Sequence, residues 1–151
     1  GDIEGAIAIY EALHSRNTNN IIVANNLASL LSAFRDDEES QDRAAAFARR
    51  LRGSEVPAFH DSYGWITYKQ GNFAEAQTYL EPAADALAAD PLVQYHLGRT
   101  YEALSRADEA IAQFVKAVEL AGPDSTLPQI ADARQRISEL RNAPETAPAT
   151  E

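Results

Sequence analysis

Residues 91–101 read PLVQYHLGRTY, and after a short break residues 107–120 read ADEAIAQFVKAVEL. Both segments carry apolar residues at the three- and four-residue spacing of one helix face. That face is formed in the first segment by Leu97, Gly98 and Tyr101, and in the second by Ala107, Ala110, Ile111, Phe114 and Ala117. The stretch therefore predicts two helices joined by a short turn, each with one apolar side.

The same pattern occurs one period earlier in the chain. Gly64 precedes Gly98 by 34 residues, and the same spacing separates Pro57 from Pro91. Further pairs at this spacing are Ala76 with Ala110, Leu80 with Phe114, and Ala83 with Ala117. A fixed period of this length indicates stacked helix pairs, in which each pair buries its apolar face against the next.

The residues of this pattern resemble the tetratricopeptide repeat. The third pair matches that family's motif at Leu97, Gly98, Tyr101, Ala110, Phe114 and Ala117. The middle pair matches at Gly64, Ala76, Leu80 and Ala83, and departs from the motif at Tyr63 and Thr67. The resemblance implies an all-α fold: a right-handed superhelix, or α-solenoid, of antiparallel helix pairs with a C-terminal capping helix.

We expect a single repeat domain over residues 1–142. It comprises a half repeat at 1–16, repeats at about 21–53, 57–90 and 91–122, and a capping helix at 126–142 that starts with a capping box of Thr126 and Gln129. The acid-rich segment 35–40 is predicted to be a solvated turn, about four residues longer than the turn of the middle repeat. The Pro-, Thr- and Ala-rich residues 143–151 are expected to form a flexible tail.

Composition limits the classes of function that the chain can have. The 151 residues carry a formal net charge of −10, which disfavours nucleic acid and anionic membrane surfaces as partners. No apolar run is long enough to span a bilayer, and the absence of cysteine excludes disulfides and thiolate metal sites. We expect a soluble protein, from the cytoplasm or the periplasm, without cofactor or metal.

Two observations bear on the origin of the chain. Methionine is absent, which suggests a segment of a longer protein or a processed product. Residues 23–31, the acid-rich turn and residues 63–71 together resemble bacterial envelope tetratricopeptide proteins, especially those linked to exopolysaccharide export and the PEP-CTERM sorting system. That narrower resemblance implies a bacterial source.

The family resemblance implies that the first helix of each pair lines a concave groove. The residues expected there are Asn25, Asn26, Ser29, Asp61, Trp65, Tyr68, Lys69, Tyr95, His96 and Arg99. Asparagine amides can pair with a peptide backbone, and tryptophan or tyrosine can anchor an apolar side chain. The leading hypothesis is a non-catalytic scaffold that binds a peptide or helix of a partner protein. For Trp65 and Tyr68 the alternative is simple packing against a neighbouring helix.

The alternative function is structural. Ile3, Ile7 and Tyr10 lie on one face of the half repeat, and the sequence upstream supplies no partner helix for that face. We expect this stripe to be exposed, so that it could drive homo-oligomerisation or stack on further repeats of a larger protein.

An enzyme is the weakest hypothesis. His60, Asp61 and Ser62 have the side chains of a hydrolase triad, but consecutive residues of one helix do not converge on a common point. His14, His60 and His96 lie in different repeats, and no two of them have the spacing of metal ligands on a helix.

Overall fold

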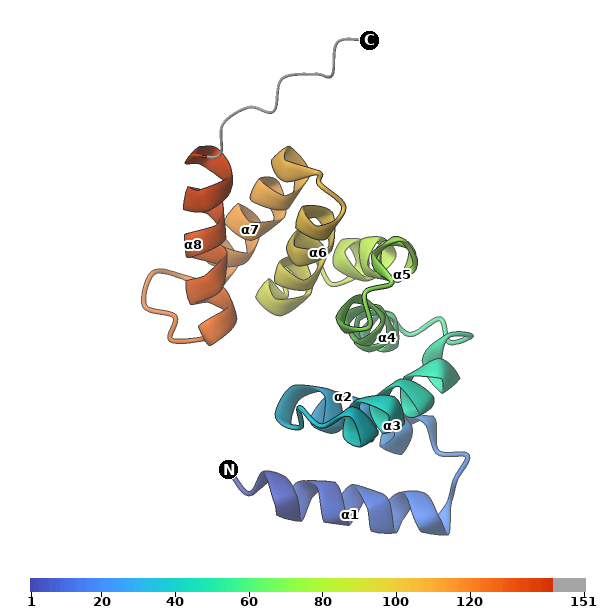
Figure 1. The fold of residues 1–151 in the computed structure, drawn as a ribbon. Helices are drawn as coiled ribbons and strands as arrows, with labels where there is room; N and C mark the ends of the chain where they lie inside the picture. Colours follow the sequence, from blue (N-terminus) through green and yellow to red (C-terminus); the bar gives the residue numbers. More distant parts are fainter. Residues whose placement is uncertain (143–151) are drawn as a thin grey trace. The chain divides into compact units, whose positions relative to one another are not determined.

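A computed structural model describes residues 1–142 of the chain (Figure 1). These residues form eight α-helices and one 3-10 turn without any strand, which confirms the all-α prediction. The chain divides into two compact units, one spanning Gly1–Ala88 and the other beginning at Ala89. The predicted flexible tail, 143–151, lies outside the described residues.

The first unit contains five α-helices. They are α1 (Ile3–Arg16), α2 (Ile21–Phe34), α3 (Glu38–Ala48, continued by the 3-10 turn Arg49–Leu51), α4 (Pro57–Lys69) and α5 (Phe73–Ala86). Short polar side chains begin three of them. Asp2, Asn20 and Asp37 each accept backbone N–H groups of the first turn of α1, α2 and α3 respectively. Pro57 is the first residue of α4. At this position a backbone N–H would have no hydrogen-bond partner within the helix, so the absence of the N–H in proline costs nothing.

The core of the first unit joins the half repeat to the pairs that follow it. One cluster packs Ile7 of α1 against Leu31 of α2 and Ala44 of α3. A second cluster lies where the first complete pair meets α4. In it, Leu51 of the first pair and Tyr63 and Ile66 of α4 pack against alanines of the first pair. The stacking predicted from the 34-residue period therefore includes the half repeat, which has its own place in the core.

The acid-rich segment is not a long loop, so that prediction is wrong. Three residues connect α2 to α3, as three connect α4 to α5, and the four extra residues lengthen the helices instead. Asp37 accepts the Ser40 N–H at 2.9 Å, which lowers the pKa of its carboxyl, and Glu38 and Glu39 occupy the first turn of α3. Acidic side chains there are stabilised by the positive end of the helix dipole.

The second unit contains α6 (Pro91–Ala103), α7 (Ala107–Ala121) and α8 (Pro128–Asn142). Gly98 of α6 lies against the fully buried ring of Phe114 on α7, where a Cβ would come within 2.7 Å of ring carbons. This close approach explains why the motif has glycine in the middle of a helix. Ile130 and Ala133 of α8 are also fully buried and pack the C-terminal helix onto the pair.

The predicted capping box at Thr126 is wrong. Helix α8 begins at Pro128, whose fixed φ suits the first helical position, so Thr126 lies one residue too early to cap it. The hydroxyl of Ser125 instead accepts the backbone N–H of Leu127 at 3.5 Å.

Candidate functional site

The predicted groove residues of the first unit come from α2 and α4, which pack side by side. Ser29 on α2 and Ser62 on α4 meet with a hydroxyl–hydroxyl distance of 3.5 Å. Asn25 donates its amide N–H to Asn26 Oδ1 at 3.3 Å. The structure therefore places Ser29 and Ser62 of these two helices against each other, and Asn25 and Asn26 are bonded to each other one turn earlier on α2.

A pocket of ≈ 290 Å³ opens between α1 and α2 beside these side chains. It is lined by Ala6 and Tyr10 of α1 and by Asn26, Ser29 and Leu30 of α2. Sequence reasoning missed the contribution of α1 because it assigned Tyr10 to a self-association surface. The signal was present in the four-residue spacing of Ala6 and Tyr10, which places both on one side of α1.

The amide of Asn25 leaves an acceptor beside the pocket. Its Oδ1 atom is buried and accepts no hydrogen bond within the part of the chain that the structure describes. Buried polar atoms normally have a partner, so this unpaired acceptor is an exception in the interior of the first unit.

The predicted self-association surface is not an exposed stripe. This prediction is wrong for the exposure of Ile3, Ile7 and Tyr10. Ile7 is only 5% exposed and packs against Leu31 and Ala44, while Ile3 and Tyr10 are half-buried. The reason is that α2 and α3 cover this face of α1, which the sequence argument had left without a neighbour. The exposed large apolar residues of α1 are Ile9 and Leu13.

Two aromatic residues of α4, Trp65 and Tyr68, pack on each other. The Trp65 and Tyr68 rings stack with centroids 4.7 Å apart and planes 5° apart, and Tyr68 also contacts Phe73 at 5.3 Å. Both residues are half-buried. Packing, the alternative considered from the sequence, therefore accounts for much of their surface.

The side chain of Lys69 connects α4 to α2. Its ammonium donates to the backbone carbonyl of Ser32, at the C-terminal end of α2. Burial lowers the pKa of this ammonium, and the nearby negative charge of Asp36 partly opposes that shift. A cation bound to a helix C-terminus is favoured by the helix dipole, so Lys69 ties α4 to α2.

In the second unit the predicted groove residues Tyr95 and Arg99 face α8. The Tyr95 hydroxyl donates to Asp132 Oδ2 at 2.8 Å, and Arg99 Nη1 donates to the same oxygen at 3.0 Å. Tyr95 is only 5% exposed, and His96 is half-buried beside it with ring centroids 6.0 Å apart. The capping helix therefore covers positions that the sequence assigned to a ligand.

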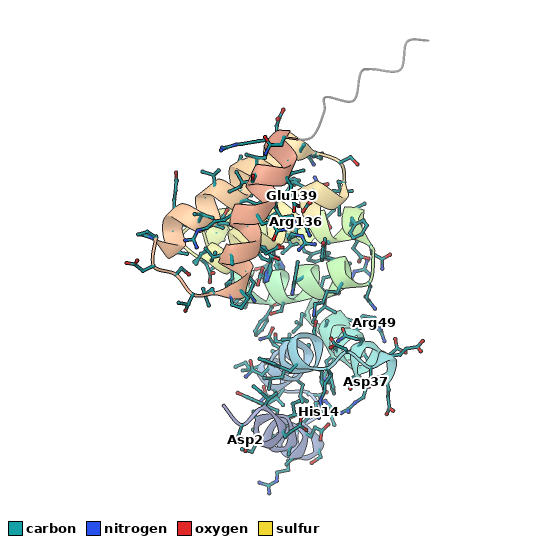
Figure 2. The ribbon with its side chains drawn as sticks, turned by 60° about the vertical axis from the view of Figure 1, so that its left-hand side comes forward. Asp2, His14, Asp37, Arg49, Arg136 and Glu139 are labelled. Atoms are coloured by element: carbon teal, nitrogen blue, oxygen red, sulfur yellow. The ribbon has the colours of Figure 1, made fainter. Side chains whose placement is uncertain are left out.

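A second set of charges continues this contact along α8. Arg136 lies 3.4 Å from Glu102 of α6, 3.5 Å from Asp132 and 3.3 Å from Glu139. Figure 2 shows Arg136 and Glu139 on α8. The pairs of Arg136 with Asp132 and Glu139 lie within α8 at helical spacing. The sequence could not reveal the pair with Glu102, because these two residues are 34 positions apart on different helices.

The Tyr95 contact predicts a specific dependence of stability on pH. Burial, together with the hydrogen bond to Asp132, raises the pKa of Tyr95 from 10.0 to about 12. The neutral phenol therefore stabilises the fold fully below pH 10, and this contribution is lost as the pH rises through about 12. A shift of this size corresponds to about 2–3 kcal/mol at most.

Urea unfolding of the wild type and of Tyr95→Phe, measured from pH 9 to 12, checks this expectation, because this range covers the interval between the ordinary pKa of 10.0 and the raised pKa of about 12. The free energy of unfolding of the wild type should fall more steeply over this range than that of the variant. Equal slopes would show that Tyr95 ionises like an exposed tyrosine.

Within residues 1–142, no three His, Asp or Glu side chains come together as ligands for a metal ion. His60 Nε2 bonds with the carbonyl of Ser54, and its ring packs on Tyr79 at 5.6 Å, so its position is set by packing. Within the same range no helix is long and apolar enough to cross a membrane.

Stacked antiparallel helix pairs, a glycine at the α4–α5 and α6–α7 crossings and a C-terminal capping helix define a helical-repeat protein of the α-solenoid class. A family model, the tetratricopeptide repeat, matches residues 93–124. The match covers the third helix pair, where the motif residues that carried the resemblance lie, and the all-α solenoid fold agrees with it. No curated protein matches the chain.

Solved structures with the same fold include bacterial tetratricopeptide proteins. TTC0263 of Thermus thermophilus, a thermophilic tetratricopeptide protein, is 23% identical, with 92% of this chain and 73% of that chain covered at a TM-score of 0.67. A crystal structure of MamA is 18% identical, with coverages of 93% and 77% and a TM-score of 0.67. A MamA fragment from Desulfovibrio magneticus RS-1 is 17% identical, with coverages of 93% and 85% and a TM-score of 0.63.

Proposed function

We propose that the first unit is a scaffold that binds an extended segment of a partner protein on the face formed by α1, α2 and α4. The observation that carries the proposal is the ≈ 290 Å³ pocket that joins Tyr10 to Asn26 and Ser29. Tetratricopeptide folds are consistent with protein–protein interaction, and the pocket supports the choice of this face.

The size and lining of the pocket favour a peptide side chain over a cofactor. Pockets for small molecules usually enclose about 300–1,000 Å³, so ≈ 290 Å³ lies at the lower limit. Ala6, Leu30 and the Tyr10 ring supply an apolar floor, on which an aliphatic or aromatic side chain can be buried. No charged side chain of the described residues lines it, so the anchor side chain need not be charged.

The amides beside the pocket suit the backbone of such a segment. Asn26 lines the pocket, and the neighbouring Asn25 has a buried oxygen without a donor. An extended peptide offers alternating N–H and C=O groups, and an asparagine amide can pair with both. Anchor and amides together would fix the register of the bound segment.

Selection of random peptides displayed on phage against the full chain tests the proposal. Peptides selected on the wild type should carry a recurrent apolar residue, and Tyr10→Ala or Asn26→Ala should weaken their binding at least about tenfold. Ile9→Ala removes an exposed apolar side chain of the same helix and serves as the matched control. Retention of full affinity by both pocket variants, with their folds intact, would place recognition elsewhere.

Self-association through Ile3, Ile7 and Tyr10 is not proposed, because Ile7 lies in the core.

A further inference from the structure

The solvent-facing side of α3 and its 3-10 continuation carries charges of both signs in a fixed order. Its exposed residues follow the three- and four-residue spacing of one helix face: Glu39, Asp42, Ala46, Arg49 and Arg50. We call these five residues the α3 ridge. The acids come first, an alanine stands in the middle, and the two arginines come last. Figure 2 labels Asp37 and Arg49, the N-cap and C-cap that mark the two ends of α3.

The charges of the α3 ridge have no partner of opposite charge in the part of the chain that the structure describes. Glu39, Asp42 and Arg49 make no ion pair there, and Arg50 contacts the imidazole of His14, at 3.2 Å, rather than an acid. Arg43, beside the ridge, is instead bonded to Glu11 of α1. The ridge charges therefore face solvent, although other arginines of the first unit are paired with acids.

We propose that the α3 ridge is the contact surface of a homodimer, in which the α3 helices of two copies cross antiparallel at Ala46. Asp42 stands four residues before Ala46 and Arg50 four residues after it. An antiparallel crossing at Ala46 therefore places Asp42 of each copy opposite Arg50 of the other. The ridge contains none of the residues that line the pocket of the first unit, so this proposal goes beyond the proposed function.

The order of charges favours a second copy over a different protein as the occupant. A two-fold symmetric interface uses the same patch on both subunits, so the patch must be complementary to itself after a half turn. The ridge meets this condition, because acids and arginines exchange places about Ala46. A basic partner would match only the acidic half, and an acidic partner only the arginines.

The small side chain at the centre permits a close crossing. Interaxial distances of packed helices are about 8–10 Å and depend on the side chains at the contact. Ala46 is exposed and places only a methyl group at the crossing point. The helix dipole favours acids at the start of any helix and arginines at its end. It does not account for their alignment on one exposed face around a small residue.

The net charge of the protein sets the conditions and the strength of this dimer. Each copy carries a formal net charge of −10, so two copies repel each other at long range. At physiological ionic strength the Debye length is about 8 Å, which screens this repulsion while charges in contact still attract. A contact of one helix per copy belongs to the class below about 1,200 Å², so we expect a Kd in the micromolar to millimolar range.

Sedimentation equilibrium of the full chain, at physiological ionic strength and up to about 1 mM protein, tests the proposal. The wild type should dimerise. Asp42→Arg and Arg50→Asp should each weaken the dimer at least about tenfold, because each places like charges opposite one another. The double variant Asp42→Arg/Arg50→Asp keeps the net charge and restores opposite charges across the crossing, so it should recover most of the lost affinity.

Glu119→Arg is the matched control. It makes the same change of charge as Asp42→Arg at an exposed residue of α7, and it should not weaken the dimer. Far-ultraviolet circular dichroism checks that every variant is folded. A wild type that stays monomeric at about 1 mM would overturn the proposal. A folded double variant as weakly associated as the single variants would overturn it as well.

A second measurement uses only the wild type and does not depend on the folding of a variant. Backbone amide resonances of the ¹⁵N-labelled chain are recorded by NMR over a dilution series. Raising the concentration should shift resonances of residues 39–50 and leave those of α7 unchanged. Shifts confined to α1, around the exposed Ile9 and Leu13, would show that the copies meet through another surface and would contradict the proposal.

Discussion

Replacing Gly98 by valine is expected to lower the free energy of unfolding by about 3 kcal/mol, the upper part of the usual range for overpacking. In an ordinary helix a side chain would improve on glycine, by about 1 kcal/mol for alanine. Here a Cβ would lie 2.7 Å from two carbons of the Phe114 ring, and that ring is fully buried and cannot move aside. The steric cost therefore exceeds the gain in helix propensity.

Urea unfolding followed by far-ultraviolet circular dichroism measures this loss. Gly53→Val is the matched control, because a Cβ at Gly53 would meet no heavy atom within 4 Å. Gly98→Val/Phe114→Leu should recover part of the lost stability by making room for the side chain. If Gly98→Val were as stable as the control, the α6–α7 crossing would have to be wider than the structure shows.

Leu80→Ala is expected to cost the first unit about 3 kcal/mol. Leu80 is fully buried, and its Cγ would lie 2.6 Å from a Cβ at Gly64, so it fills the space above that glycine. Truncation removes buried methyl groups and leaves a cavity, which together cost about 2–5 kcal/mol. Leu80 of the middle repeat thus has the role that Phe114 has in the third.

The single tryptophan, Trp65, lies in the first unit, so its fluorescence during urea unfolding reports the loss from Leu80→Ala directly. Leu13→Ala makes the same substitution at a leucine that is 42% exposed and should change the stability by less than about 1 kcal/mol. Similar losses from both variants would mean that burial at Leu80 does not decide its contribution.

The repeat architecture could be predicted from the sequence because it depends on local patterns. Gly64 and Gly98 stand one period apart in the sequence. Gly64 lies against Leu80 and Gly98 lies against Phe114, and these two large side chains are also one period apart. Helix periodicity and glycine spacing suffice to determine such contacts. The turn at Asp37 was missed because apolar spacing cannot show whether extra residues extend a loop or the helices on either side of it.

The candidate site was predicted less well, for a different physical reason. A period places Asn26 and Tyr95 on the first helix of a pair, but it does not say which neighbour covers that helix. Tyr10 reaches Asn26 from α1, and Asp132 reaches Tyr95 from α8, across 37 residues of sequence in the second case. Both neighbours, α1 and α8, lie outside the three complete helix pairs, so the 34-residue period does not describe their positions.

The bond from Lys69 to the carbonyl of Ser32 bears on how the helix pairs of the first unit unfold. In a one-dimensional Ising description, each repeat has an intrinsic stability and each junction adds a coupling energy. Lys69 belongs to one repeat and Ser32 to the preceding one, so their bond contributes to the junction. Weakening such a junction lowers cooperativity, so that one repeat can melt while its neighbour stays folded. A single ammonium thus helps two repeats to behave as one thermodynamic unit.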